Sequence, residues 1–252
     1  PRMNVLVGKI LPMNPHTEEV TILAIECATS VLTIALAHHD SVNVLYEGST
    51  VKHGQCLLPL VKMLCEQESV MLDTIDLVAA GIGPGSFTGV RTAITAAQGL
   101  AFSLDKPVVG ISSLQALAWQ AQARGASGVL LTLLDARMGE YYSAVYRCTD
   151  SRVPPELLLP PSLEKPGAIG PWLDYKPTLC IGNMGGEESK IWKKLPTIEA
   201  FPTAAAVAAL GKLAWSKKQI LLPEQLQALY VRNHVAMTIS ERADSGQVIE
   251  SK

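Results

Sequence analysis

Charge is scarce in this sequence, and neither sign dominates. Only 17% of the 252 residues are charged, and 21 basic residues against 23 acidic ones give a net charge of −2. Proteins that bind nucleic acid on their own usually carry a clustered basic excess, so the composition does not predict such binding. The sequence also has no stretch of about 20 consecutive apolar residues, which excludes an ordinary transmembrane helix. We therefore expect a cytoplasmic protein with no membrane contact.

Cysteine and histidine are poor in the spacings that metal or disulfide chemistry requires. The five cysteines are odd in number and include no Cys-x-x-Cys, which is typical of buried thiols in a reducing compartment. The five histidines include no His-x-x-x-His. His38 and His39 are adjacent, and neighbours on a strand point to opposite faces of the sheet. The sequence therefore predicts neither a disulfide framework nor a metal site.

The most informative feature that is present is a long segment with almost no charge. Between Leu77 and Leu104 the only charged side chain is Arg91, and a glycine-rich turn, Gly81–Gly89, lies in the segment. The residues after this turn, 86–104, are predicted to form a helix. An amphipathic surface helix shows charge on one face. This helix is therefore expected to be buried on more than one side or to bind a partner.

The glycine-rich turn matches none of three motifs that bind phosphate or transfer acyl groups. A P-loop needs a lysine, the dinucleotide-binding fingerprint needs a third glycine where Ser86 lies, and the nucleophile elbow needs flanking glycines around that serine. The backbone N–H groups at the helix start could still hold an anion. The alternative is a tight turn that allows close backbone packing. Both interpretations stay open, and the candidate anion or nucleotide contacts are Glu26, Gly83, Gly85, Ser86 and Asp135.

A strand–acid–turn–strand pattern occurs twice along the chain. The first copy ends its strand at Glu26, and the second ends its strand at Asp135. Two units of this kind predict an α/β fold of duplicated type, with two βββαβα halves as in the actin, sugar-kinase and heat-shock-ATPase superfold. The expected division is a disordered leader (1–20), a first half (21–112), a second half (113–202), a segment that returns to the first half (about 203–236) and a disordered tail (237–252).

The two acids lie where nucleotide-hydrolysing members of this superfold hold metal and phosphate. Those members usually follow the acid with glycines, which let the backbone approach the phosphate. Here Cys27, Ala28 and Thr29 follow Glu26, and the first glycine after Asp135 is Gly139. We therefore interpret both hairpins as poor nucleotide-binding elements.

Five separated motifs occur along the chain: Ile25–Ser30, His53–Pro59, Gly83–Arg91 with Ala97–Ala101, Asp135–Tyr142 and Leu229–Asn233. In their sequence and order they resemble the bacterial TsaB family, also called YeaZ-type. The resemblance covers about residues 21–236. One departure is Ile25-Glu26-Cys27, where family members commonly have Ile-Asp-Thr, and we expect the fold to tolerate it.

The resemblance implies a function in tRNA modification. TsaB proteins are non-catalytic partners of TsaD, and with the ATPase TsaE they attach a threonylcarbamoyl group to the adenosine next to the tRNA anticodon. This chain would bind and activate a TsaD-type transferase, and it would reach a TsaE-type ATPase and tRNA only through the complex. It would hold no cofactor of its own, and ATP or ADP would bind at the level of the complex. The catalytic relative carries a His-x-x-x-His where this chain has Ile111–Leu117, which lacks histidine.

The resemblance also implies where the partner binds. The predicted helices 55–68 and 86–104 would pack against the same two helices of TsaD, and the same surface could pair with a second copy of this chain. Ala97→Glu should then block pairing without unfolding the chain, unless Ala97 faces its own sheet. The expected interface residues are Leu57, Leu60, Val61, Leu64, Arg91, Ala93, Ala97 and Leu100.

Two other functions are alternatives to this one. An active ATPase or sugar-type kinase of the same superfold would need phosphate-binding hairpins with glycines, which the sequence lacks. A peptidase, a function once attached to the wider family, would need a nucleophile with a base or a set of metal ligands. The spacing of the residues predicts neither.

Overall fold

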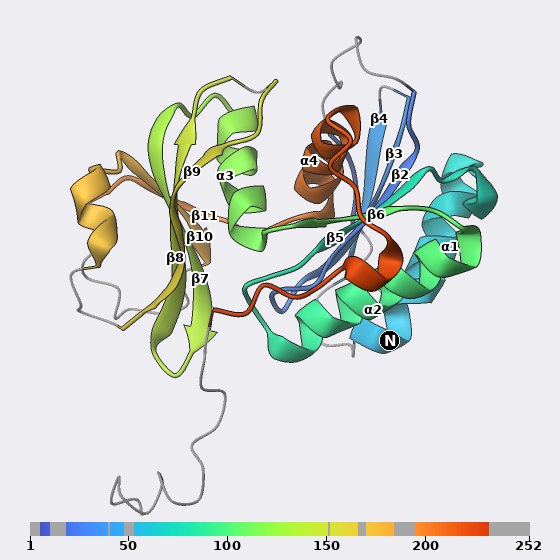
Figure 1. The fold of residues 1–252 in the computed structure, drawn as a ribbon, viewed down its shortest axis with the longest axis horizontal. Helices are drawn as coiled ribbons and strands as arrows, with labels where there is room; N and C mark the ends of the chain where they lie inside the picture. Colours follow the sequence, from blue (N-terminus) through green and yellow to red (C-terminus); the bar gives the residue numbers. More distant parts are fainter. Residues whose placement is uncertain are drawn as a thin grey trace, which may run out of the picture.

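The fold consists of two β-sheets with helices between them and on one outer side (Figure 1). The computed structural model describes residues 6–10, 19–39, 41–47, 53–150, 152–165, 170–183 and 195–231. The first sheet is built mainly from the N-terminal part of the chain and the second from the middle part. Two helices lie in the space between the sheets: α3 (Ser113–Ala123), which follows the last strand of the first sheet, and α4 (Ala204–Ser216), which follows the last strand of the second.

The first sheet has the strand order β1-β4-β3-β2-β5-β6. Strand β2 lies at its centre, pairs antiparallel with β3 and parallel with β5, and is buried along its whole length. Such continuous apolar strands are typical of a sheet covered on both faces. The strands are β1 (Leu6–Ile10), β2 (Ile22–Glu26), β3 (Leu32–His38), β4 (Ser41–Glu47), β5 (Leu77–Gly81) and β6 (Val108–Ile111).

The second sheet repeats this arrangement. Its order, β11-β10-β7-β8-β9, corresponds to β6-β5-β2-β3-β4 in the first sheet, with the same antiparallel hairpin beside a parallel pair. The prediction of a duplicated α/β fold is therefore confirmed. The strands are β7 (Gly128–Arg137), β8 (Glu140–Cys148), β9 (Glu156–Glu164), β10 (Leu179–Asn183) and β11 (Thr197–Glu199).

Four α-helices in the described part of the chain cover these sheets. Helices α1 (His53–Glu68) and α2 (Phe87–Leu104) pack on one face of the first sheet, and α4 (Ala204–Ser216) packs on its opposite face. Helix α3 (Ser113–Ala123) crosses over to the second sheet, where it packs on β7 and β8. Because α3 follows the first sheet and α4 follows the second, each helix ties one half of the molecule to the other.

The last described segment, which we call the C-terminal strap (residues 219–231), joins the two halves a third time. Leu221 and Val108, on the edge strand β6, form an antiparallel β-bridge in which the N–H of each donates to the carbonyl of the other. The Leu229 N–H donates to the Ile82 carbonyl. The strap then passes from the first half to the second, where Val231 packs on the core around α3. It also includes one turn of 3₁₀-helix at Pro223–Gln225.

Two expectations about local structure need correction. Residues 6–10 were expected to belong to a disordered leader, but they form β1 and pair along their length with β4. Helix α1 begins at His53 rather than at residue 55, which places Pro59 in its second turn. The rest of the predicted leader up to residue 18, and the predicted tail 237–252, lie outside the described residues.

Candidate functional site

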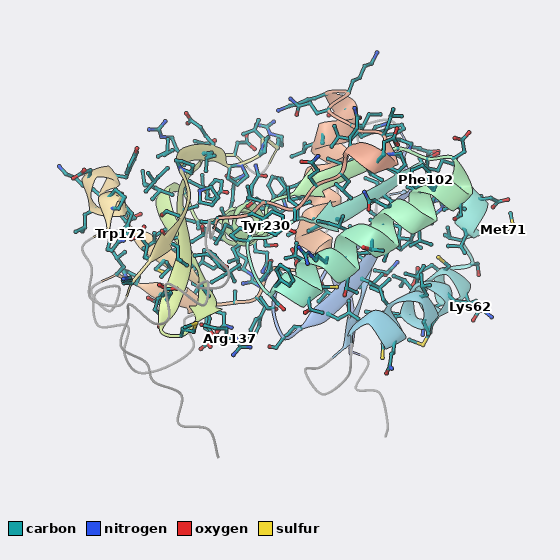
Figure 2. All side chains as sticks on the ribbon, turned by 60° about the horizontal axis from the view of Figure 1, so that its bottom comes forward. Lys62, Met71, Phe102, Arg137, Trp172 and Tyr230 are labelled. Atoms are coloured by element: carbon teal, nitrogen blue, oxygen red, sulfur yellow. The ribbon has the colours of Figure 1, made fainter. Side chains whose placement is uncertain are left out.

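A cavity of about 1160 Å³ lies between the two halves, where the two β-hairpins face each other. Tyr230 of the strap lies at this junction (Figure 2). The position corresponds to the place where the sequence suggested an anion or nucleotide contact. Four segments contribute most of the lining: the turn after β2 (28–30), the glycine-rich turn with the start of α2 (84–90), the turn after β7 (135–137) and the strap (228–231).

Glu26, the acid that ends β2, does not reach this cavity. Its side chain is 0% exposed. One carboxylate oxygen accepts a hydrogen bond from the Ala28 N–H at 2.7 Å, and the other accepts one from the Ser113 hydroxyl at 2.8 Å. Burial raises the pKa of this carboxyl from 4.5 to about 7 because it disfavours the charged form, although the hydrogen bonds oppose the shift. Glu26 therefore links β2 to the start of α3 and does not contact a ligand in the cavity.

The glycine-rich turn packs against the first hairpin more closely than any side chain would allow. A Cβ at Gly81 would overlap the Glu26 carboxylate, one at Gly85 would overlap the Ala28 carbonyl, and one at Gly89 would overlap the Cys27 carbonyl. Of the two interpretations of this turn, close backbone packing accounts for these glycines.

Ser86 lies within this turn and is the N-cap residue of α2. Its backbone N–H donates to the Ala28 carbonyl at 2.7 Å, and its hydroxyl accepts from the Gly89 N–H at 3.3 Å, which caps the helix. Gly85 and Ser86 line the cavity, whereas Gly83 is buried and does not. The N–H groups of Ser86 and Gly89 at the helix start thus already donate to acceptors within the protein.

Asp135, the acid of the second hairpin, differs from Glu26 because it does line the cavity. One of its oxygens accepts from the Arg137 N–H at 2.7 Å, and the other lies 3.7 Å from the Arg137 guanidinium. Its side chain is 22% exposed. Within the described ranges, no three Asp, Glu, His or Cys side chains are close enough together to hold a metal ion. Among the described residues that line the cavity there is thus one acid, and Arg137 of its own hairpin neutralises it.

A second candidate site is a groove of about 790 Å³ on the outer surface of α1 and α2. Large apolar side chains on or beside it are exposed: Leu58 by 56%, Phe87 by 47% and Phe102 by 61%. Gly99 lies in the middle of α2, and a Cβ there would have no neighbour within 4 Å. A glycine inside a helix costs about 1 kcal/mol relative to alanine. The described residues give no reason for that cost, because they leave the space outside Gly99 open.

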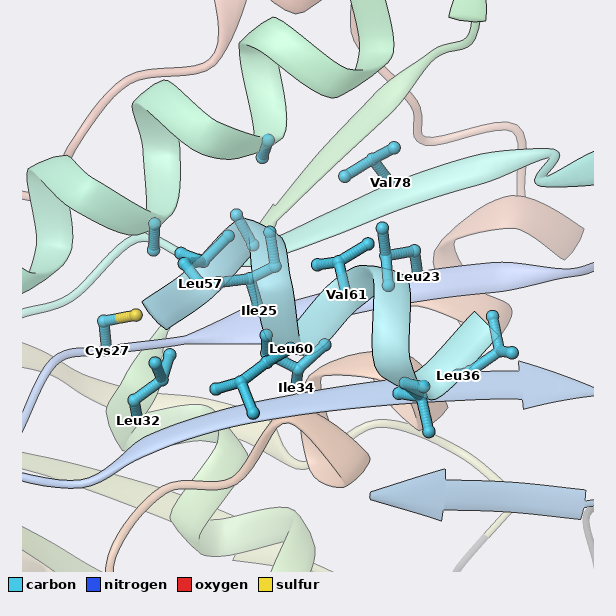
Figure 3. Packing of buried hydrophobic residues seen from close by; sticks show 14 of the residues in the cluster. Leu23, Ile25, Cys27, Leu32, Ile34, Leu36, Leu57, Leu60, Val61 and Val78 are labelled. Carbon is cyan, nitrogen blue, oxygen red and sulfur yellow. The ribbon is translucent and has the colours of Figure 1, made fainter. Parts of the chain in front are cut away.

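The predicted interface residues lie mostly on the wrong face of these helices. The side chains of Leu57, Leu60 and Val61 point from α1 into the core of the first sheet (Figure 3). Leu100 is half-buried, and Arg91 is exposed. Side chains this deep in the core cannot touch a partner, so the prediction is corrected for the buried set: Leu57, Leu60, Val61, Leu64, Ala93 and Ala97.

The exposed face of α2 instead consists of residues that the sequence argument did not select. We call this set the outer face of α2. Arg91 could have located it, because an exposed charge marks the solvent side of a helix and its neighbours at helical spacing share that side. From Arg91 that spacing leads to Thr88, Thr95, Gly99 and Phe102, all of which are exposed. Leu58 on α1 and Tyr230 on the strap could not be found this way, because they come from other elements.

Comparisons with known proteins agree on one relationship. A family model described as TsaD, tRNA N6-adenosine threonylcarbamoyltransferase, matches residues 38–165. The tRNA threonylcarbamoyladenosine biosynthesis protein TsaB of Escherichia coli K12 is 32% identical, over 85% of this chain and 96% of its own length. The protein of the same name from Bacillus subtilis is 37% identical over 50% of this chain and 55% of its own length.

Solved structures give the same picture at the level of the fold. YeaZ from Pseudomonas aeruginosa superposes with a TM-score of 0.72 at 30% identity, covering 84% of this chain and 99% of that one. A second Pseudomonas aeruginosa structure, described as an uncharacterized protein with similarity to peptidase YEAZ, has a TM-score of 0.74 at 30% identity, over 84% and 100% of the two chains. None of the helices in the described part of this chain has the length and hydropathy needed to cross a membrane.

Proposed function

The chain belongs to the TsaB family of tRNA threonylcarbamoyladenosine biosynthesis proteins, and from this premise we propose that it acts as a non-catalytic subunit. In this proposal it binds and activates a TsaD-type transferase through the outer face of α2 and the adjoining surface of α1. It meets a TsaE-type ATPase and tRNA only within the complex. It holds no cofactor of its own, and ATP or ADP belongs to the complex.

The observation that carries the proposal is the groove between α1 and α2. Exposed apolar side chains, such as Leu58, Phe87 and Phe102, border an exposed glycine, Gly99, that no described residue covers. Small residues at a helix surface let a second helix approach closely, and exposed apolar patches mark contact sites. Helix α2 has 18 residues and α1 has 16, lengths that suit a partner helix pair. A specific interface of standard size buries about 1,600 Å² in total.

The state of the first hairpin supports the non-catalytic part of the proposal. Glu26 has both carboxylate oxygens occupied by Ala28 and Ser113, so it is not free to hold a metal ion or orient a phosphate. Ser113 belongs to Ile111–Leu117, the stretch where the resemblance places the metal-binding histidines of the catalytic relative. The glycine-rich turn is fitted to the protein backbone at Cys27 and Ala28. Glu26 and the glycine-rich turn, which would bind metal or phosphate in a catalytic relative, therefore make contacts within the protein itself.

The experiment is a reconstitution of threonylcarbamoyl transfer to tRNA with a TsaD-type transferase and a TsaE-type ATPase. We expect transfer to depend on this chain and to be restored when the purified chain is added. Transfer that is unchanged without the chain would contradict the proposal. The measured product is threonylcarbamoyladenosine in the tRNA, so the readout does not depend on ATP hydrolysis by any single component.

The cavity between the halves favours a second candidate, an active ATPase or kinase of the same superfold. Its volume of about 1160 Å³ exceeds that of most small-molecule pockets, and it lies between the two hairpins. Two observations weigh against it. Asp135 is paired with Arg137 of its own hairpin, and Glu26 is buried and hydrogen-bonded to Ser113. Titration of the isolated chain with ATP decides between the two: micromolar affinity with turnover would support the ATPase. A homodimer through the same helices would be seen in sedimentation of the isolated chain.

A further inference from the structure

Among the residues that the structure describes, Arg91 is the only charged one that lines the groove between α1 and α2. Its guanidinium carbon lies 3.6 Å from the centroid of the Phe87 ring and 5.9 Å from that of the Tyr230 ring. Its Nε donates a hydrogen bond of 3.1 Å to the Tyr230 hydroxyl. Two aromatic rings and one hydrogen bond thus hold a long side chain in one orientation. Such preorganisation lowers the entropy that a binding partner has to remove.

The guanidinium of Arg91 has no carboxylate to pair with in the described part of the chain. By contrast, Arg137, Arg147 and Arg152 each lie within ion-pair distance of an acid on their own surface. The hydrogen bond to Tyr230 uses Nε, which leaves the two terminal NH₂ groups to bind an acceptor from outside. The groove around them is neutral and largely apolar, which strengthens any charge pair formed there once water is excluded.

We propose that Arg91 determines the specificity of the proposed interface by pairing with an Asp or Glu carboxylate on a helix of the TsaD-type subunit. This inference rests on the proposed function. The planar guanidinium can form two parallel hydrogen bonds with a carboxylate, which fixes the register of the partner helix against α2. Gly99 lies two helical turns further along the same face, where that helix can approach closely. Arg91 then fixes the register, and the open surface at Gly99 allows close contact.

A carboxylate fits this position better than an RNA phosphate does. RNA-binding surfaces combine several cations, because each phosphate contact contributes a modest electrostatic term. Here Arg91 is the single cation among the described residues of the groove, and Lys62, the one lysine of α1, already pairs with Glu66 at 3.7 Å. The walls of the groove, including Leu58 and Phe87, are apolar, as at the centre of a protein–protein contact.

The test measures the affinity of the full chain for the TsaD-type subunit by calorimetry in the absence of tRNA. We expect Arg91→Ala to weaken binding by about 10- to 100-fold, because it removes a charge-assisted pair. Arg91→Lys should recover only part of this loss, since lysine lacks the bidentate geometry. Rising salt should weaken the wild type more than Arg91→Ala. The matched control, Lys62→Ala, removes a cation from the same surface but outside the groove and should bind like the wild type.

A second variant separates pairing from positioning of the strap. Tyr230→Phe keeps the ring but removes the hydroxyl that holds Arg91 Nε, so it should weaken binding only about two- to five-fold by loosening the arginine. If Tyr230→Phe costs as much as Arg91→Ala, the arginine acts through the strap, and the inference is wrong. Wild-type affinity in Arg91→Ala, or binding that requires tRNA, would also overturn it. No binding by the wild type would instead refute the proposed function, so the two failures are distinguishable.

The rescue experiment identifies the carboxylate. Arg91→Glu should bind more weakly than Arg91→Ala, because two like charges then face each other across the contact. Replacing each acidic residue on the helices of the TsaD-type subunit by arginine should restore binding to Arg91→Glu at one position. If no position restores it, the partner group is not a carboxylate and the proposal fails.

Discussion

The two faces of α2 carry little charge, with Arg91 outside and no charged residue inside, but they have opposite surroundings. On the inner face Ala93, Ala97 and Ala101 lie against the first sheet and are 0% exposed. On the outer face Thr95 and Gly99 are exposed, and no residue in the described part of the chain covers the glycine. Low charge thus has two causes in one helix. Burial against the sheet excludes charge from the inner face. The outer face, where Arg91 is the one charged residue, is the surface that we assign to a partner.

The glycines of this region show the same contrast. Gly89 faces inward, where a Cβ would overlap the Cys27 carbonyl, and Gly99 faces outward, where a Cβ would meet nothing. The first glycine is required by the fold of the chain itself. The second one lowers helix stability without any gain inside the chain. If the comparison is right, the same substitution should act in opposite directions at the two positions.

The largest expected effect comes from placing a carboxylate on each face in turn. Ala97→Glu should lower the free energy of unfolding by about 3–5 kcal/mol, because it buries a charge that has no partner. Thr95→Glu, two residues away but on the outer face, should change it by less than about 0.5 kcal/mol. Urea unfolding followed by circular dichroism measures both. Equal destabilisation by the two variants would remove the distinction between the faces.

A pH effect of similar size is expected from Glu26, on the buried side of the comparison. Folding raises its pKa from 4.5 to about 7, so the folded state binds a proton more tightly than the unfolded state does. This contribution to stability is fully present below pH 4.5 and is lost as pH rises to 7 and above. The loss amounts to about 3 kcal/mol.

Glu26→Gln provides the control for that titration. The amide keeps the acceptor for the Ala28 N–H, and the Ser113 hydroxyl can reverse its hydrogen bond to accept from the NH₂ group. We expect the stability of this variant to be nearly flat between pH 5 and pH 8, measured by urea unfolding at each pH. A variant with the same pH slope as the wild type would show that another group titrates.

The next effect concerns the inward glycine. Gly89→Ala should destabilise the chain by about 1–3 kcal/mol, because the new methyl group meets a backbone carbonyl that has little freedom to move. The midpoint of thermal unfolding reports the change. A neutral result would mean that the turn and the first hairpin can separate, and the close packing that we describe would not constrain this position.

The smallest effect concerns the outward glycine and has the opposite sign. Gly99→Ala should stabilise the isolated chain by up to about 1 kcal/mol, because alanine has the higher helix propensity and its methyl group has open space. The same thermal measurement applies. Destabilisation by this variant would indicate that the space outside Gly99 is filled by the chain itself.

Much of the fold could be predicted from local patterns. The two strand–acid–turn–strand hairpins, around Glu26 and Asp135, identify the duplicated α/β architecture, and Ser86 caps α2 beside the helix start that the sequence predicts. Strand β1 was missed because Lys9 interrupts a short apolar run, and only pairing with β4 makes that run a strand. Long-range pairing of this kind leaves no signal within the segment itself.

The candidate site was harder to predict, because its key features depend on contacts between distant residues. Ala97 and Thr95 both have small, uncharged side chains, so residue type alone does not tell which of them faces the sheet. The burial of Glu26 becomes visible only when Ser113, from the start of α3, is brought against it. Tyr230 and Arg91 are likewise distant in sequence, and the strap brings them together.

The most direct test of the account is the affinity of the TsaD-type subunit for Thr95→Glu, compared with the wild type and with Ala123→Glu. Ala123 is exposed at the end of α3, away from the groove, and serves as a control of equal charge. We predict that Thr95→Glu binds at least about 100-fold more weakly, because its carboxylate would be buried at the contact and would compete for Arg91, one helical turn away, while Ala123→Glu binds like the wild type. Equal affinity of all three would contradict the assignment of the outer face of α2 to a partner.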